Sequence, residues 1–198
     1  MKTSLITAAS RNEFEIIETP IPGCFEIQPP IHRDSRGSLV KIFHLDQFRM
    51  LGLETNWPEE FYSRSVEGVL RGLHLLTPPH HQSKIVTCVQ CVVLDVIVDL
   101  RVGSPAFGKH FLFELSAERA NMIYVGKGVA HGFYVPSGEA ILHYRVSTMY
   151  SAPHDKGIRW DSAGIPWPTV SPFVSARDAA LPPLQEFSSP FPFQGVHP

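Results

Sequence analysis

The sequence is poor in cysteine and lacks long apolar runs. Its 198 residues include only 3 cysteines, Cys24, Cys88 and Cys91. A sparse and odd set argues against a disulfide scaffold and favours a reducing compartment, so we expect a cytoplasmic protein. No apolar run reaches the roughly 18 residues that a membrane-spanning helix needs, and we expect no membrane contact. The start, Met1–Ala9, carries too short an apolar patch for a secretory signal.

An excess of charge is also missing. Lys and Arg number 17 and Asp and Glu 19, a formal net charge of −2. So small an imbalance speaks against a nucleic-acid partner, although it leaves room for a local basic pocket that binds a small anion. The spacing Cys88-x-x-Cys91 lies in a strand-like run, where we favour two ordinary strand cysteines over a redox or zinc pair.

Turn residues are plentiful. With 14 Gly and 18 Pro, the chain favours short elements separated by turns. A short helix is predicted within Leu45–Leu53. Strands are predicted over residues 68–74, 84–89, 92–100, 110–115, 122–125, 130–135 and 140–148. Many short strands without intervening helices favour an antiparallel sandwich or barrel over a parallel α/β sheet. We expect one all-β domain over residues 1–184, then a Pro/Ser/Phe-rich tail over 185–198 that is ordered only against the body or a neighbouring subunit.

Ionisable side chains interrupt the apolar strands. His74, Lys84, His131 and Tyr144 each lie in or beside a run of Val, Leu, Ile or Phe. Taken singly, each has an ordinary structural explanation, as does Asp178 at a helix start or in a loop. If several point into one pocket, they supply an acid, a base and an electrophile.

Strand geometry adds a condition. Arg71 and His74 are three residues apart, so a regular strand sends them to opposite faces. Both can enter one pocket only where the strand bulges or bends. Gly72 lies between them and is the residue type that permits a bulge.

Several motifs occur in the order of one enzyme family. They are Asp34-Ser35-Arg36-Gly37, Ser63-Arg64-Ser65, GVLRGLH over 68–74, Lys84-Ile85-Val86, Asp95–Arg101, Ser104–Gly108, GVAHGF over 128–133, Tyr144–Tyr150, Trp160-Asp161, Trp167-Pro168 and Ser175–Asp178. On these residues the chain resembles the dTDP-4-dehydrorhamnose 3,5-epimerases across about residues 14–184. GVLRGLH and AHGF are specific when they occur together.

The resemblance implies a cupin jelly-roll β-barrel with short peripheral helices, working as a homodimer. The implied substrate is a 4-keto-6-deoxyhexose on a nucleoside diphosphate, inverted at C3, C5 or both without cofactor or metal. The hydrogens beside the C4 ketone are acidic because the carbanion delocalises into an enolate. The reaction needs a base on one face, a proton donor on the other and a cation near the ketone oxygen.

The resemblance also implies roles for particular residues. His74 would be the base, with Asp178 holding its imidazole. Lys84 would stabilise the enolate oxygen, and Tyr144 would return the proton from the opposite face. The implied substrate-binding residues are Arg71 on the diphosphate, Arg36 from a neighbouring subunit, and His131, Ser63, Ser65, Glu59, Tyr150 and Trp160.

The chain departs from the family around this set. Leu75 and Leu76 stand where the family usually has an aromatic residue and Gln, and Lys41 stands where it has an acid. Glu59 and Phe61 replace the usual Gln and Asn, and Cys91 replaces a turn glycine. The catalytic set is intact while the surroundings of sugar and nucleotide are altered. The motifs therefore predict proton chemistry beside a ketone and leave open the nucleobase, the sugar, and whether C3 alone, C5 alone or both are inverted.

Two other functions remain to be weighed. The segment 126–131 resembles the second half of a cupin metal motif, and His74, His80, His81 and His131 could bind a transition metal in an oxygenase or isomerase. However, the first half of that motif is absent, because no His lies two residues after His74 and residues 77–82 contain no carboxylate. The third hypothesis is a cupin that binds a sugar nucleotide without catalysis.

Overall fold

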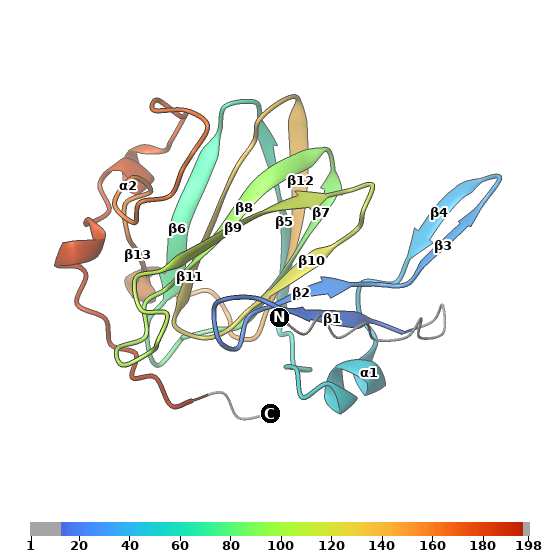
Figure 1. Ribbon diagram of the computed structural model, residues 1–198, viewed down its shortest axis with the longest axis horizontal. Helices are drawn as coiled ribbons and strands as arrows, with labels where there is room; N and C mark the ends of the chain where they lie inside the picture. Colours follow the sequence, from blue (N-terminus) through green and yellow to red (C-terminus); the bar gives the residue numbers. More distant parts are fainter. Residues whose placement is uncertain (1–12, 196–198) are drawn as a thin grey trace, which may run out of the picture.

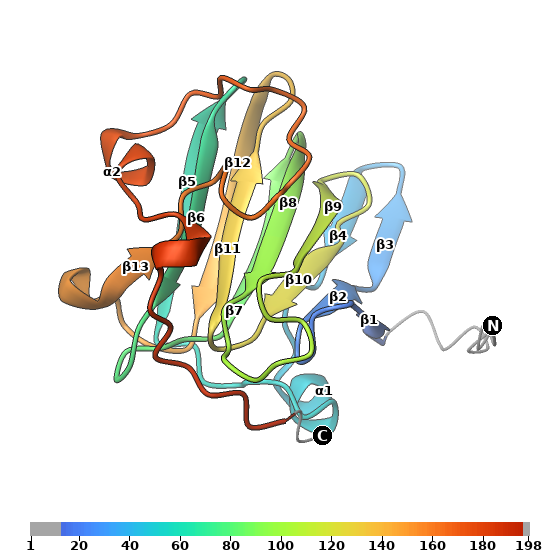
Figure 2. The ribbon, with the colours of Figure 1, turned by 60° about the vertical axis from the view of Figure 1, so that its left-hand side comes forward.

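Two antiparallel sheets form the body of the molecule in the computed structural model, which describes residues 13–195. The first has six strands in the order β1 (Glu15–Glu18), β2 (Phe25–Gln28), β10 (Met122–Val125), β7 (Lys84–Gln90), β12 (Glu139–Val146) and β5 (Glu59–Val66). The second has five, in the order β13 (Asp155–Gly157), β6 (Leu70–Leu76), β11 (Val129–Tyr134), β8 (Val92–Asp99) and β9 (His110–Ser116). Figures 1 and 2 show the two sheets facing each other as a barrel-like sandwich.

The main core lies between the sheets. Val86 and Leu142 from the first sheet pack in one cluster with Ile97, Leu115 and Phe133 from the second, and all five are essentially inaccessible. Strand β12 alternates between buried and half-buried residues along its whole length, the pattern of a strand with one face on a core. Apolar burial between two sheets is therefore what holds the two walls at a fixed separation.

Helices are few and peripheral. They are α1 (Leu45–Met50), α2 (Ala176–Ala179) and two 3₁₀ turns, Ala152–His154 and Leu184–Glu186. The all-β jelly-roll prediction with short peripheral helices is confirmed. The helix predicted within Leu45–Leu53 is present, although it ends at Met50, and Phe48 is its buried anchor. Within residues 13–195, no helix has the length and apolarity needed to cross a bilayer.

Some local predictions need correction. Cys91 is not a strand residue: it occupies the turn between β7 and β8 with a φ of +69°, the left-handed conformation that favours glycine. The strand predicted from Gly68 begins at Leu70, because Gly68 is in a turn with a φ of +79°. All three cysteines are free.

A separate hairpin extends away from the barrel. Strands β3 (Ile31–Asp34) and β4 (Gly37–Val40) pair only with each other. Figure 1 shows this hairpin on the side of the molecule opposite to α2 and β13. Most of its residues are exposed, so the hairpin contributes little to the core of the barrel.

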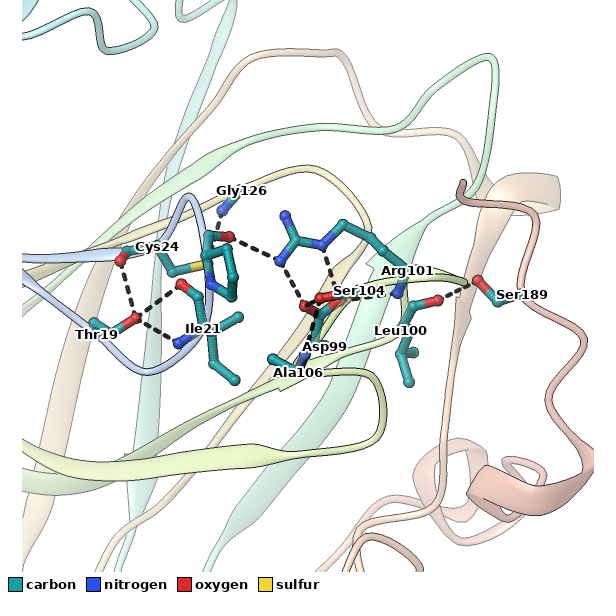
Figure 3. Close-up of polar contacts among 11 residues, drawn as sticks. Thr19, Ile21, Cys24, Asp99, Leu100, Arg101, Ser104, Ala106, Gly126 and Ser189 are labelled. Atoms are coloured by element: carbon teal, nitrogen blue, oxygen red, sulfur yellow. Dashed lines mark hydrogen bonds and ion pairs between the residues drawn. The ribbon is translucent and has the colours of Figure 1, made fainter. Parts of the chain in front are cut away.

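The C-terminal segment lies against one end of the barrel. Val102 forms a parallel bridge with Pro192, and Phe191 is buried. Figure 3 shows the hydroxyl of Ser189 donating to the carbonyl of Leu100, beside the buried pair of Asp99 and Arg101. These contacts hold the segment against the barrel from Ser189 to Pro192. The residues 1–9, for which a signal was considered, and the last three residues of the tail lie outside the described part of the chain.

Candidate active site

A cavity of about 250 Å³ opens between the two sheets. Its lining comes from five strands, β5, β6, β7, β11 and β12. The segment just before β7 and the helix α2 each add one residue. The lining residues are Phe61, Ser63, Arg71, His74, Gln82, Lys84, His131, Phe133, Tyr144 and Arg177. His74 belongs to the five-stranded sheet and Tyr144 to the six-stranded sheet, so the two rings come from opposite walls of one cavity.

A carboxylate holds the imidazole of His74. Nε2 of His74 lies 2.9 Å from Oδ1 of Asp178, which is the contact that the sequence predicts. Oδ2 of Asp178 accepts a hydrogen bond from the backbone N–H of Gly72 at 3.1 Å. Burial raises the pKa of Asp178, but the hydrogen bond and charge of His74 and the Gly72 N–H outweigh it, and the net shift is downward. An ionised Asp178 therefore fixes the orientation of the ring.

The short helix α2 delivers this carboxylate. Its N-cap is Ser175, whose hydroxyl accepts a hydrogen bond from the backbone N–H of Asp178 at 3.0 Å. Capping of this kind satisfies a backbone donor that a helix end otherwise leaves unpaired. Asp178 is the buried residue of the helix, so the cap sets where the carboxylate meets β6.

The predicted bulge brings Arg71 and His74 to the same cavity. The pairing of β6 with β11 shifts register between His131 and Phe133, opposite Gly72. Gly72 has a φ of +135°, and a Cβ at this position would lie 2.6 Å from Cα of Gly132. Only glycine fits this close approach of two backbones. The bulge breaks the strict alternation of side chains, and both Arg71 and His74 line the cavity.

Lys84 is a buried cation at the floor of the cavity. Its Nζ donates to the backbone carbonyl of His74 at 3.3 Å. Burial lowers the pKa of Lys84 to about 8, and the charges of Asp155 and Asp95 offset part of that shift. A buried ammonium with few fixed partners interacts strongly with any negative charge that develops beside it.

His131 and Asp95 form a second buried pair. Nε2 of His131 lies 2.9 Å and 3.0 Å from the two carboxylate oxygens of Asp95. Burial raises the pKa of Asp95, while His131 and Lys84 oppose the shift. The ring of His131 lies edge-on to that of Tyr144, with centroids 6.1 Å apart. The pair therefore supports the wall of the cavity from within the core.

Tyr144 is the buried phenol of the opposite wall. Its side chain is only 7% exposed, and burial raises its pKa well above the ordinary value. The phenol consequently stays protonated across the physiological range and can act as a proton donor. Phe61 on the neighbouring strand β5 lies directly opposite Tyr144, and the two rings stack.

The structure brings some of the predicted substrate-binding residues to the cavity and leaves others outside its lining. Arg71 and Ser63 line it, and Ser65 accepts a hydrogen bond from Nε of Arg71 at 2.9 Å. Outside the lining, Glu59 accepts from the backbone N–H of Tyr150 at 2.6 Å, and the phenol of Tyr150 donates to Asp155.

Two more predicted residues are not part of the cavity lining. Trp160 accepts a hydrogen bond from the indole of Trp167 through its backbone carbonyl. Arg36 lies on the exposed β3–β4 hairpin, where it pairs with Asp34. The cavity within this chain is therefore lined without Arg36.

Some site residues escape the sequence argument. Gln82 and Arg177 line the cavity from segments without strand periodicity, and Asp155 holds Arg177 through a 2.6 Å ion pair. Oε1 of Gln82 is buried and has no hydrogen-bond partner within the described part of the chain, as is typical of an atom that meets a ligand. Asp95 could have been found from the sequence, because a carboxylate inside an apolar strand needs a buried partner.

The four histidines considered as metal ligands do not converge. The rings of His74 and His131 are held by two different carboxylates, and the ring of His80 packs on that of His154 with centroids 4.5 Å apart. His81 lines a different cavity, beside Lys127. Among residues 13–195, no three His, Cys, Asp or Glu side chains are grouped so that they could hold a metal ion.

The cavity therefore combines three chemical groups around one space. A carboxylate-held imidazole lies on one wall, a buried neutral phenol on the other, and an ammonium group is adjacent to the imidazole. Such a set can remove a proton from an acidic C–H on one face, stabilise the resulting oxyanion and return a proton on the other face.

Comparisons with known proteins point to one family of enzymes. The family model described as dTDP-4-dehydrorhamnose 3,5-epimerase matches residues 18–186. A dTDP-4-dehydrorhamnose 3,5-epimerase of Shigella flexneri is 38% identical over 166 residues, covering 82% of this chain and 92% of that protein. A dTDP-4-dehydrorhamnose 3-epimerase of Streptomyces niveus is also 38% identical, covering 80% and 78%.

A solved structure is similar throughout the barrel. It is a dTDP-6-deoxy-D-glucose-3,5-epimerase from Legionella pneumophila in complex with dTDP-4-keto-L-rhamnose. The TM-score is 0.84 at 34% identity, over 89% of this chain and 95% of the other. The similarity thus extends over nearly the full length of both chains.

Proposed function

This chain belongs to the dTDP-4-dehydrorhamnose 3,5-epimerase family, and from that premise we propose which of its residues carry the reaction and which nucleotide it takes. The activity is epimerisation of a nucleotide-linked 4-keto-6-deoxy sugar. The proposed substrate is the thymidine diphosphate sugar, supported by the names of the relatives. Family membership favours this activity over a metal-dependent oxygenase and over a binder without catalysis.

His74 is the base in this proposal. With Nε2 bonded to Asp178, the ring nitrogen left to accept a substrate proton is Nδ1. Removal of a hydrogen beside the ketone turns the neutral imidazole into an imidazolium. The ionised carboxylate of Asp178 stabilises that cation and keeps the ring in one orientation. General-base catalysis of this kind contributes about 10²–10⁴-fold.

Lys84 stabilises the enolate. The C4 oxygen becomes negative as the C–H bond breaks, and an ammonium in a buried site interacts with that charge more strongly than it could in water. The carbonyl of His74 accepts a hydrogen bond from Nζ of Lys84, which keeps the ammonium beside the base. Base and cation are thus adjacent, as the C–H and C=O groups of the substrate are.

Tyr144 returns the proton on the opposite face. Its place in the six-stranded sheet, across the cavity from the five-stranded sheet of His74, supports this role. A phenol that remains protonated because it is buried is a suitable donor to an enolate carbon. Transfer from Tyr144 inverts the centre, whereas return from His74 restores it.

Positively charged side chains bind the diphosphate. Arg71 is oriented by Ser65 at the rim of the cavity, and a guanidinium binds phosphate oxygens in a defined geometry. We propose that the protein is a homodimer in which the projecting hairpin carries Arg36 to the partner's site. Ser63, His131, Glu59, Tyr150 and Trp160 complete the proposed substrate-binding set, and Gln82 joins it as an acceptor for a sugar hydroxyl.

The observation that carries the proposal is one cavity with the carboxylate-held His74 on one wall and Tyr144 on the other. We propose cytoplasmic action, supported by three free cysteines. Proton NMR in D₂O tests the chemistry with 4-keto-6-deoxy sugars linked to dTDP, CDP or GDP. We expect deuterium to enter at C3, C5 or both of the dTDP sugar, with inversion at each productive centre.

The variant Tyr144→Phe sharpens this test. Because the base and the cation remain, deuterium exchange should continue while inversion falls by about 10²-fold or more. An equal loss of exchange and inversion would show that Tyr144 is not the special donor. Wild-type protein that exchanges no hydrogen with any of the three nucleotide sugars would refute the proposed function as a whole.

A further inference from the structure

The proton donor of the proposed mechanism contacts two aromatic rings. The ring of Phe61 stacks on Tyr144 with centroids 4.8 Å apart and an interplanar angle of 13°. The ring of His131 meets Tyr144 edge-on at 76°, with centroids 6.1 Å apart. His131 is buried and is held by both carboxylate oxygens of Asp95, so the stacked ring of Phe61 is the more exposed of the two contacts.

The position of Phe61 follows from strand register. Phe61 on β5 lies directly opposite Tyr144 on β12, so the two side chains project from the same face of the sheet and meet as a cross-strand pair. Strand β5 is the edge strand of the six-stranded sheet. Phe61 is therefore 45% exposed whereas Tyr144 is 7% exposed, and Phe61 covers the donor at the mouth of the cavity.

The aromatic character of residue 61 matters to this pair. Phe61 offers the phenol a flat apolar face, and a side chain without a ring could neither stack in this way nor exclude water from that face as well. The contact of Phe61 is with the proposed donor, Tyr144.

We propose that Phe61 is a positioning residue that holds the phenol of Tyr144 against the substrate face opposite His74. It thereby sets how often the enolate is protonated from the inverting side. This inference rests on the proposed roles of His74 and Tyr144. An enolate has two fates: a proton from Tyr144 inverts the carbon, and a proton from His74 restores the original centre after exchange with solvent. A phenol that leaves its place shifts the balance toward restoration.

The ratio of inversion to deuterium exchange measures this balance. Phe61→Leu keeps apolar volume without an aromatic face, and Phe61→Tyr keeps the stacking ring. Because Phe61 is half exposed on an edge strand, we expect both variants to fold. The ratio should fall about 10–100-fold in Phe61→Leu and stay close to wild type in Phe61→Tyr, while exchange itself continues in both.

A matched control lies next in the chain. Tyr62 is 69% exposed and pairs with His143 rather than with Tyr144, so its side chain is on the other face of the strand. Tyr62→Ala should leave the ratio of inversion to exchange unchanged. A reduced ratio in this control would mean that loosening of β5, rather than the stack, is responsible, and it would overturn the proposal.

Three further outcomes would overturn it. The first is an unchanged ratio in Phe61→Leu, including the case in which only KM rises, which would make Phe61 a substrate contact. The second is an equal loss of exchange and inversion. The third is a Phe61→Tyr variant as defective as Phe61→Leu. In all of these the wild type still exchanges and inverts, so the proposed function stands. A wild type without exchange would refute that function and this inference together.

Discussion

The residue with the greatest effect at the scale of single side chains is His74. Replacing it with Ala removes the proposed base and leaves the buried carboxylate of Asp178 without its imidazole partner. We expect loss of deuterium exchange at both C3 and C5, by about 10²–10⁴-fold. Proton NMR in D₂O at matched protein concentration checks this. Exchange at the wild-type rate in His74→Ala would move the role of base to another residue.

The lowered pKa of Lys84 predicts that the rate of deuterium exchange depends on pH. Burial lowers its pKa to about 8, against the opposing charges of Asp155 and Asp95, while Arg177 lowers it further. The ammonium is present below that pKa and is lost above it, so enolate stabilisation weakens as the pH rises through about 8. We expect the rate of exchange to show an alkaline fall in that range.

Two substitutions of Lys84 test the assignment of this fall. Lys84→Met keeps the volume without the charge, and exchange should drop about 10²–10³-fold at pH 7. Lys84→Arg keeps a cation at higher pH, so the alkaline fall of whatever activity remains should move upward. An alkaline fall at the same pH in Lys84→Arg would assign it to a different group.

At the scale of elements, β13 ties the loop after β12 to the strand of His74. Gly157 pairs with His74, and a Cβ at Gly157 would lie 1.9 Å from the carbonyl oxygen of Leu73. Gly157→Ala must therefore push β13 away from β6. We expect a loss of about 1–3 kcal/mol in the free energy of unfolding, measured by urea denaturation. We also expect slower exchange, because His74 shifts with its strand.

The neighbouring residue supplies the control. Lys156 lies on the same strand with an exposed side chain. Lys156→Ala should change the unfolding free energy by less than about 0.5 kcal/mol. Equal stability of Gly157→Ala and wild type would mean that the two strands can separate without cost, contrary to the tight pairing described here.

The elements also show where the sequence predicts structure and where it does not. Apolar runs predict β7, β8 and β12 because these strands pack against the core. The run Glu59–Val66 is missed as a strand because it lies at a sheet edge, where its polar and aromatic residues meet solvent and Ser65 is its one fully buried position. An apolar sequence pattern identifies a strand through its buried residues, and few residues are buried at the edge of a sheet.

The site divides in the same way. Polar residues inside apolar strands single out His74, Lys84, His131 and Tyr144, and Gly72 predicts the bulge that brings Arg71 to the same cavity. Their convergence depends on pairing between strands far apart in sequence, such as His131 opposite His74. No local pattern encodes that register. The lining residues Gln82 and Arg177 lie in irregular segments, so periodicity carries no information about them.

At the scale of the whole molecule, the projecting hairpin bears on the proposed dimer. Figures 1 and 2 show β3 and β4 on the side opposite α2, whose Asp178 holds His74. Arg36 on this hairpin is 88% exposed, and it bonds only its near neighbour Asp34 among the described contacts of its side chain. A charged side chain at the hairpin tip that contacts only a neighbouring residue of the tip would suit the diphosphate site of a second subunit in the proposed dimer.

The dimer hypothesis predicts complementation between two defective subunits. Arg36→Ala alone should lower kcat/KM by about 10–100-fold, as loss of a charge-assisted hydrogen bond does, and His74→Ala should be inactive. In a purified heterodimer of the two variants, one site combines an intact His74 with the Arg36 of the partner, while the other site lacks both. About half of the wild-type activity should then return, because a two-fold dimer contains two equivalent sites.

Two affinity tags allow the heterodimer to be isolated, with each homodimer as its control. If Arg36 instead acted within its own subunit, each site of the heterodimer would contain one defect and activity would stay at the level of the homodimers. A chain that sediments as a monomer at assay concentration while fully active would also contradict the arrangement, since no second hairpin would then be present to complete the site.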